Sequence, residues 1–259
     1  MVRSSLVMLI SMLLALTAAQ RVHAQGWQPL FNGYSFDGWT TQNGTPVTAD
    51  AWKVEDGGVM HLNTAVGRGG NILSGREYGN FELVFEWNIS EKGNNGIKYR
   101  VNDFGGRVLG VEYQVIDDAG KNLKPKHKTA SLYDIYEPID HNLLKPPGEW
   151  NRGRIVVQGN LIEHWVNGNL VTKAEVGSQE WNDRIAKSKF HDVENFGATP
   201  TGRIMITDHN DEVRYRNIFI RELSGVPDCS AIAQCVQPCC SHQQVCKPRR
   251  RLLGFFRRR

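Results

Sequence analysis

Cysteine is absent from the long central part of this chain, residues 25–224, and all five cysteines follow it. Small secreted domains often depend on disulfides, but a segment of this length can bury a sufficient core without them. The length fits one substantial domain. Residues 25–224 are therefore predicted to fold as a single domain held together by its core.

The chain also lacks an apolar run long enough for a transmembrane helix at its start, where the stretch at 6–19 is too short to span a bilayer. This stretch follows Arg3 and leads to Val22-His23-Ala24, the layout of a secretory signal with an A-x-A-like cleavage site. No cysteine lies near this site, which argues against a lipid-anchored lipoprotein. Residues 1–24 are predicted to be a signal peptide, and the protein to be secreted or periplasmic.

An excess of positive charge is missing from the central part as well. The formal net charge is +4, but the last thirteen residues carry +7, which leaves −4 for residues 25–224 once Arg3, Arg21 and Asp228 are counted. A mildly acidic domain argues against nucleic acid as the main partner.

The segment at 225–259 differs from the rest in composition. It holds Cys229, Cys235, Cys239, Cys240 and Cys246, and it closes with arginines that flank an apolar stretch at 252–256. In a secreted chain these cysteines favour disulfides over zinc, and five leave one thiol over. We expect a tail with little fixed structure that can contact an anionic membrane or cell-wall surface.

No βαβ rhythm and no internal repeat occurs in the central part, where short strand patterns dominate. The clearest places five large apolar residues on one parity of 81–89; others lie at 154–158, 161–166, 170–174, 203–207 and 213–223. Asn167-Gly168 predicts a tight hairpin turn, because both turn positions need positive φ. One helix is expected after Ser178 as N-cap, through Trp181 and Ile185. The pattern predicts an all-β, two-sheet sandwich of the jelly-roll kind.

Two further strand patterns carry chemically useful side chains. In 97–101 the alternation places Lys98 and Arg100 on one face, and in 111–116 it places Glu112 and Gln114 on one face. If these strands are neighbours, a cation pair and a carboxylate–amide pair share a surface suited to a hydroxyl-rich ligand. The alternative is an ordinary solvated outer face of a sheet.

Several phrases together resemble the bacterial 3-keto-disaccharide hydrolase family, over about Gly26 to Leu223. They lie at 26–33, 38–39, 52–57, 78–83 and 147–151, with Asn95-Gly96-Ile97-Lys98-Tyr99-Arg100, Glu112-Tyr113-Gln114-Val115-Ile116-Asp117 and Asp208-His209. The resemblance implies a jelly roll of the concanavalin or laminin-G type with one or two short helices. It also implies an enzyme that acts on glycosides oxidised at C3, so that a base can remove the acidified C2 hydrogen and expel the C1 substituent. A cation, a hydrogen-bond donor or a divalent metal would then stabilise the C3 oxygen.

The chain departs from the family pattern at two places. Asn94-Asn95-Gly96 replaces Asn-Ser-Gly, and Ile206-Thr207-Asp208-His209-Asn210 replaces Leu-Gln-Asp-His-Gly. The second change removes an amide beside the predicted site, and Asn210 in place of glycine predicts an altered turn.

Site residues follow from the strand faces and the resemblance. Glu112 is the leading candidate for base or metal ligand, and His209 with Asp208 follows as catalytic. Substrate binding is predicted for the residues Arg100, Gln114, Tyr133, Lys189 and Trp150. Structural alternatives are an Asp208 turn cap, a core Tyr133 and a helix-end Lys189, while His164 is expected on a sheet surface. The predicted function is cleavage of 3-keto-glycosides; a non-catalytic carbohydrate-binding module at the cell surface and a structural surface protein remain open.

Overall fold

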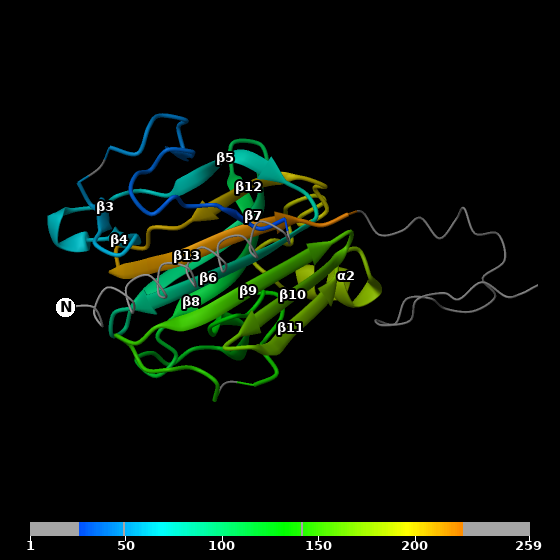
Figure 1. Ribbon diagram of the computed structural model, residues 1–259. Helices are drawn as coiled ribbons and strands as arrows, with labels where there is room; N and C mark the ends of the chain where they lie inside the picture. Colours follow the sequence, from blue (N-terminus) through cyan, green and yellow to red (C-terminus); the bar gives the residue numbers. More distant parts are fainter. Residues whose placement is uncertain (1–25, 49, 141, 225–259) are drawn as a thin grey trace, which may run out of the picture. The chain divides into compact units, whose positions relative to one another are not determined.

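The computed structural model describes residues 26–48, 50–140 and 142–224, and Figure 1 shows their arrangement. The predicted signal peptide at 1–24 and the tail at 225–259 lie outside these residues. In the part of the chain that is described, no helix is long and apolar enough to cross a membrane.

Two antiparallel sheets form the domain (Figure 1). The larger runs in the order β11 (Asn169–Glu175), β10 (Leu161–Val166), β9 (Asn151–Gln158), β6 (Phe81–Ile89), β13 (Val213–Glu222), β4 (Val59–Leu62) and β3 (Trp52–Glu55), with β1 (Gln28–Pro29) paired to β13. The smaller runs in the order β2 (Trp39–Thr41), β5 (Ile72–Tyr78), β12 (Gly202–Ile206), β7 (Asn94–Asp103) and β8 (Val108–Ile116). Helix α2 (Gln179–Ile185) follows β11, and 3-10 turns lie at Thr64–Val66 and Pro125–His127.

The core lies between the two sheets. All five apolar residues of the predicted parity in β6 are buried, and the Phe85 ring meets the edge of Tyr113 from β8 at 5.3 Å between centroids. Because each inner face is apolar, burial of these side chains drives the sheets together. The predicted all-β sandwich of jelly-roll type is confirmed.

Local signals predicted two connections correctly. Asn167 and Gly168 join β10 to β11 with φ of 47° and 89°, as the hairpin turn requires. The Ser178 side chain accepts a hydrogen bond from the Trp181 N–H at 3.1 Å and so caps α2. Strands β1 to β5 were not predicted. Each of β1 to β4 spans only two to four residues, a pattern too short to stand out, and Gly75 interrupts β5.

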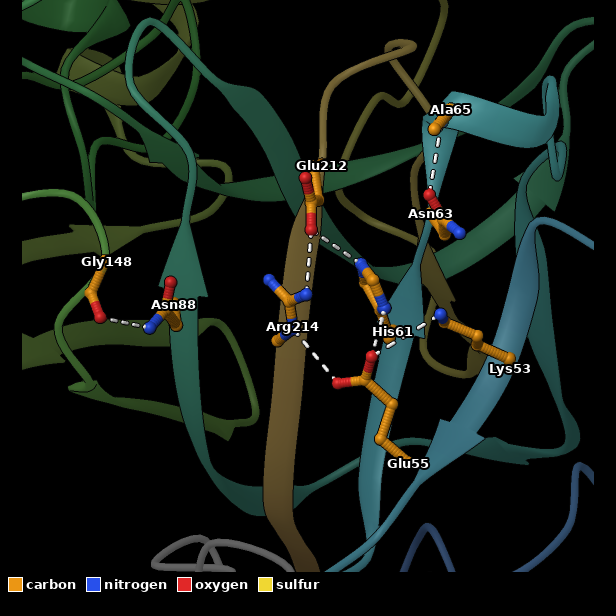
Figure 2. Close-up of polar contacts among 9 residues, drawn as sticks. All are labelled: Lys53, Glu55, His61, Asn63, Ala65, Asn88, Gly148, Glu212 and Arg214. Carbon is orange, nitrogen blue, oxygen red and sulfur yellow. Dashed lines mark hydrogen bonds and ion pairs between the residues drawn. The ribbon is translucent and has the colours of Figure 1, made fainter.

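The outer face of the larger sheet carries a closed set of charges, the His61 cluster: Glu55, His61, Glu212 and Arg214 (Figure 2). His61 lies 2.7 Å from Glu55 through Nδ1 and 2.9 Å from Glu212 through Nε2, while Arg214 contacts both carboxylates at 3.0 and 2.8 Å. Both ring nitrogens of His61 therefore lie within hydrogen-bond distance of a carboxylate. Each carboxylate of this cluster contacts both His61 and Arg214.

Candidate active site

Glu112 lies on the outer face of the smaller sheet, because its neighbours in β8 point into the core. Strands β7 and β8 are adjacent, as predicted, and Lys98 pairs across them with Glu112 at 3.8 Å between Nζ and Oε2. Gly96 makes room for this carboxylate, since a Cβ at position 96 would collide with it. The strand pair therefore holds one carboxylate, only 5% exposed, beside one ammonium group.

Gln114 shares the face of Glu112 but is itself buried. Its Nε2 donates to the Asn94 Oδ1 at 2.9 Å. The amide nitrogen is thus bound within the protein, so Gln114 supports the floor of the site through Asn94.

Tyr133 and Lys189 reach the same place from two separate segments. The Tyr133 N–H donates to the Glu112 carbonyl oxygen at 3.1 Å, so the backbone at Tyr133 lies along the edge of β8. The Lys189 Nζ lies 4.1 Å from the centroid of the Tyr133 ring, within the range of a cation–π contact. These two predicted residues are therefore neighbours.

Asp134 fastens these segments together and was missed in the sequence. Its carboxylate accepts the Lys189 N–H at 2.6 Å and contacts His127 Nε2 at 2.7 Å and Lys126 Nζ at 2.8 Å. Burial by itself raises the pKa of Asp134, but these hydrogen bonds outweigh it and lower the pKa to about 2. Its place directly after the predicted site residue Tyr133 was the available signal.

His209 follows β12 and lies close enough to Glu112 to interact with its charge. Asp208 before it lies buried, and its carboxylate accepts the N–H groups of Gly70 and Asn210, each at 2.7 Å. These bonds favour a positioning role for Asp208, the predicted turn cap, over a catalytic one. Asn210 has φ of 65°, a conformation that glycine favours and asparagine tolerates, so the replacement of glycine suits this turn.

Charge interactions show that Lys98, Glu112, Lys189 and His209, the Glu112 cluster, act on one another. Loss of hydration lowers the pKa of His209; Glu112 opposes this effect, and both lysines add to it. Burial likewise lowers the pKa of Lys189, with Glu112 again opposing and Lys98 adding. The imidazole of His209 and the ammonium group of Lys189, each with a lowered pKa, therefore interact with one carboxylate.

Arg100 does not share the face of Lys98, and that prediction is wrong. The register of β7 shifts between Tyr99 and Asn102, and Arg100 takes φ of 49°. This bulge breaks the alternation, so its guanidinium turns away and donates to the carbonyl oxygens of Gly79 and Gly159. Arg100 is a buried link between turns.

Trp150 and His164 also lie elsewhere. Arg216 of β13 covers the Trp150 ring at 4.0 Å, and Arg216 pairs with Glu86 on the outer face of the larger sheet. Trp150 is therefore on the opposite side of the sandwich from Glu112. His164 is fully buried in the core, not on a sheet surface: Nδ1 donates to the Ala130 carbonyl oxygen and Nε2 lies 2.8 Å from the Tyr99 hydroxyl. Burial lowers its pKa to about 4.

The sequence left open whether the site binds a divalent metal. Among the described residues no three His, Cys, Asp or Glu side chains converge on one point. Glu112 and His209 have suitable donor atoms, but the Asp208 carboxylate is directed to backbone N–H groups. The described residues do not make a complete ligand set for a divalent metal.

Comparison with known proteins identifies the family of this chain. A family model described as a 3-keto-alpha-glucoside-1,2-lyase-like domain matches residues 26–221. A 3-keto-disaccharide hydrolase of Bacteroides thetaiotaomicron is 31% identical over 234 residues, which cover 78% of this chain and 80% of that protein.

Two solved structures from Parabacteroides distasonis, both provisionally described as glycosyl hydrolases, share the fold. The first has a TM-score of 0.70 and 31% identity, and the match covers 79% of this chain and 97% of the other. The second has a TM-score of 0.63 and 26% identity, with 76% of this chain and 99% of the other covered.

Proposed function

The chain belongs to the family of 3-keto-alpha-glucoside-1,2-lyase-like domains, and we propose that this glycosyl hydrolase-like enzyme cleaves 3-keto-glycosides. The reaction is elimination across C1 and C2 followed by addition of water. The Glu112 cluster is the observation that carries the proposal, because it joins one carboxylate base to two ammonium groups and a neutral imidazole.

Glu112 removes the proton from C2 of the sugar. The C3 ketone makes this hydrogen acidic, since the electrons left behind can move into the C3 oxygen. A carboxylate can serve as the base only if it is ionised and free of a tight partner. The nearest cation, the Lys98 Nζ, stands 3.8 Å from the Glu112 carboxylate, which is longer than a direct hydrogen bond.

The negative charge that develops on the C3 oxygen needs stabilising donors. His209 is suited to this task because its lowered pKa keeps the ring neutral near pH 7, with one N–H to donate. Lys98 contributes positive charge from the sheet surface. These groups replace the oxocarbenium stabilisation of ordinary glycosidases, which need two carboxylates flanking the bond.

Lys189 gives a proton to the departing oxygen as the C1–O bond breaks. Its lowered pKa makes its ammonium group a better acid than an ordinary lysine. Water then adds at C1 of the enone and returns a proton to Lys189, while the Glu112 carboxyl group, after its proton has exchanged with solvent, protonates C2. The sum is one glycoside and one water converted to a 3-keto sugar and an alcohol, with both side chains restored.

We further propose that the enzyme acts after export, in the periplasm or outside the cell. The predicted signal peptide at 1–24 and the cysteines of the tail support this assignment. The arginine-rich end would hold the enzyme near an anionic surface, where soluble oligosaccharides pass.

The direct test is an NMR time course of the full chain with 3-keto-trehalose in D2O, with and without EDTA. Elimination and hydration predict release of glucose and of 3-keto-glucose that carries deuterium at C2. Because ketones also exchange this hydrogen spontaneously, 3-keto-glucose alone with the enzyme is the control. Release without deuterium at C2 would show direct hydrolysis, and binding without release would show a carbohydrate-binding module. Loss of release in EDTA would add a metal to the reaction.

A further inference from the structure

A polar pocket of about 410 Å³ lies at one end of the smaller sheet, where β2 ends, β5 begins and β12 ends. Its volume is within the range of about 300–1,000 Å³ that ligand sites occupy. Besides Gly70, the lining consists of Thr41, Gln42, Asn43, Arg68, Asn71 and Asp208. No aromatic or aliphatic side chain belongs to it.

The strand register connects this pocket to the Glu112 cluster. One row crosses the outer face of the smaller sheet: Gln42, Asn71, Thr207, Gly96 and Gln114. The Glu112 carboxylate lies over Gly96 in this row, and Asn71 is two strands away. Neighbouring strands are about 4.8 Å apart, so the pocket begins roughly 10 Å from the carboxylate. A ligand of two joined rings can occupy both places.

The walls of the pocket combine donors and acceptors. Asn71 Nδ2 donates to Gln42 Oε1 at 3.0 Å, which fixes one wall and leaves the Gln42 amide nitrogen to the pocket. Arg68 and Asn43 have no hydrogen bond or ion pair to any described residue. The Asp208 carboxylate accepts two backbone N–H groups and keeps further lone pairs.

Such a lining matches the hydroxyl groups of a sugar, since each hydroxyl both donates and accepts. A guanidinium and amides supply donors to the ring oxygens, and Asp208 accepts from hydroxyls while it repels an anion. A flat aromatic ligand would bind less favourably, because it would leave the polar side chains of the pocket without hydrogen bonds and would have no aromatic ring to stack on.

We infer that this pocket, the Arg68 pocket, binds the sugar that leaves when the 3-keto-glycoside is cleaved. The inference rests on the proposed function, and it adds where the second ring lies and which leaving groups the enzyme prefers. With the keto sugar over Gly96, the glycosidic oxygen points along the row, past His209, toward Asn71. The enzyme therefore selects glycosides with a hydroxyl-rich leaving group over those with a small or apolar one.

The test compares two substrates, 3-keto-trehalose and methyl 3-keto-α-glucoside, which differ in whether a second ring enters the pocket. In the double variant Gln42→Ala/Arg68→Ala, the ratio of kcat/KM for the disaccharide to that for the methyl glycoside is expected to fall roughly tenfold or more. Arg76→Ala is the matched control, because Arg76 of β5 is also an exposed arginine but pairs with Glu222 of β13 and does not line the pocket. An unchanged ratio would overturn the inference.

Binding of unoxidised trehalose separates this inference from the proposed function. Trehalose has no ketone and cannot eliminate, so calorimetric titration reports the pocket whether or not the enzyme turns over. Weaker binding to the double variant than to the wild type and Arg76→Ala supports the pocket even if 3-keto-trehalose is not cleaved. Equal affinity of all three proteins, or no binding to the wild type, would refute it. Thermal unfolding of each variant confirms that the fold is retained.

Discussion

Two clusters of charge occupy opposite outer faces of the sandwich and differ in how their charges are paired. In the His61 cluster every contact is 3.0 Å or shorter, and both carboxylates contact His61 and Arg214 (Figure 2). In the Glu112 cluster three basic groups surround one carboxylate, and the ion pair there is 3.8 Å long. In the His61 cluster the polar groups are paired with one another, and these contacts stabilise the sheet. The Glu112 cluster leaves donors and a base available, which is what a ligand or substrate requires.

The largest expected effect comes from removing the carboxylate of the Glu112 cluster. Glu112→Gln should lower kcat on 3-keto-trehalose by about 10²- to 10⁴-fold, because it removes the base that takes the C2 proton. Affinity for trehalose should stay within a fewfold, since the amide keeps the shape of the side chain. Steady-state kinetics and calorimetry measure the two quantities. Retained turnover would move the catalytic site away from Glu112.

A third histidine, His164, lies in the core between the two clusters' sheets. Its burial predicts that the free energy of unfolding depends on pH. Its folded pKa is about 4, against 6.5 for an ordinary histidine, so the unfolded chain binds more protons between these values. Stability is therefore lost as pH falls through this window, by about 3 kcal/mol. Denaturant unfolding from pH 7 to pH 4 of the wild type and His164→Gln measures it, because other titrating groups are common to both.

The expected result is that the wild type loses more unfolding free energy than His164→Gln over that range. Parallel curves would contradict the prediction. If the variant does not fold, the imidazole signals of the wild type give the same answer, since the His164 ring should stay neutral down to about pH 4.

Breaking the His61 cluster should affect stability and leave catalysis alone. Glu55 contacts His61, Arg214 and, at 3.6 Å, Lys53, so Glu55→Gln weakens three interactions at once. Because the carboxylate is about a third exposed, we expect a loss of about 1–2 kcal/mol. Chemical denaturation measures this value. Glu180→Gln on α2 is the control, since its exposed pair with Arg184 should contribute less than about 0.5 kcal/mol. A fall in kcat for Glu55→Gln would contradict the prediction that the His61 cluster affects stability alone.

The smallest expected effect is a shift along the pH axis. The lowered pKa of Lys189 predicts that kcat/KM falls, as pH rises, at a lower pH than an ordinary lysine would cause. Lys189→Arg should reduce the rate and shift the fall of kcat/KM to higher pH, since arginine keeps its proton. Rates are measured against a blank, because 3-keto-glycosides eliminate spontaneously in base. If kcat/KM of Lys189→Arg falls at the same pH as in the wild type, a group other than Lys189 causes the fall.

Sequence alone determined much of the fold. The strands β6, β9 to β13, the Ser178 cap and the Asn167-Gly168 turn follow from alternation, capping and positive φ, which are properties of neighbouring residues. The same alternation placed Glu112 on a polar face beside Lys98. Such features depend on a few consecutive residues, so a sequence displays them directly.

Only the tertiary structure decided which side chains meet. A bulge turned Arg100 toward Gly79, and buried pairing in the core enclosed His164. Asp134 joins Lys189 to Tyr133 across more than fifty residues of chain, and the Arg68 pocket draws its walls from three separate strand ends. These contacts depend on register and loop paths between distant segments. The physical reason is that backbone geometry is set locally, whereas a site is made by the packing of remote parts.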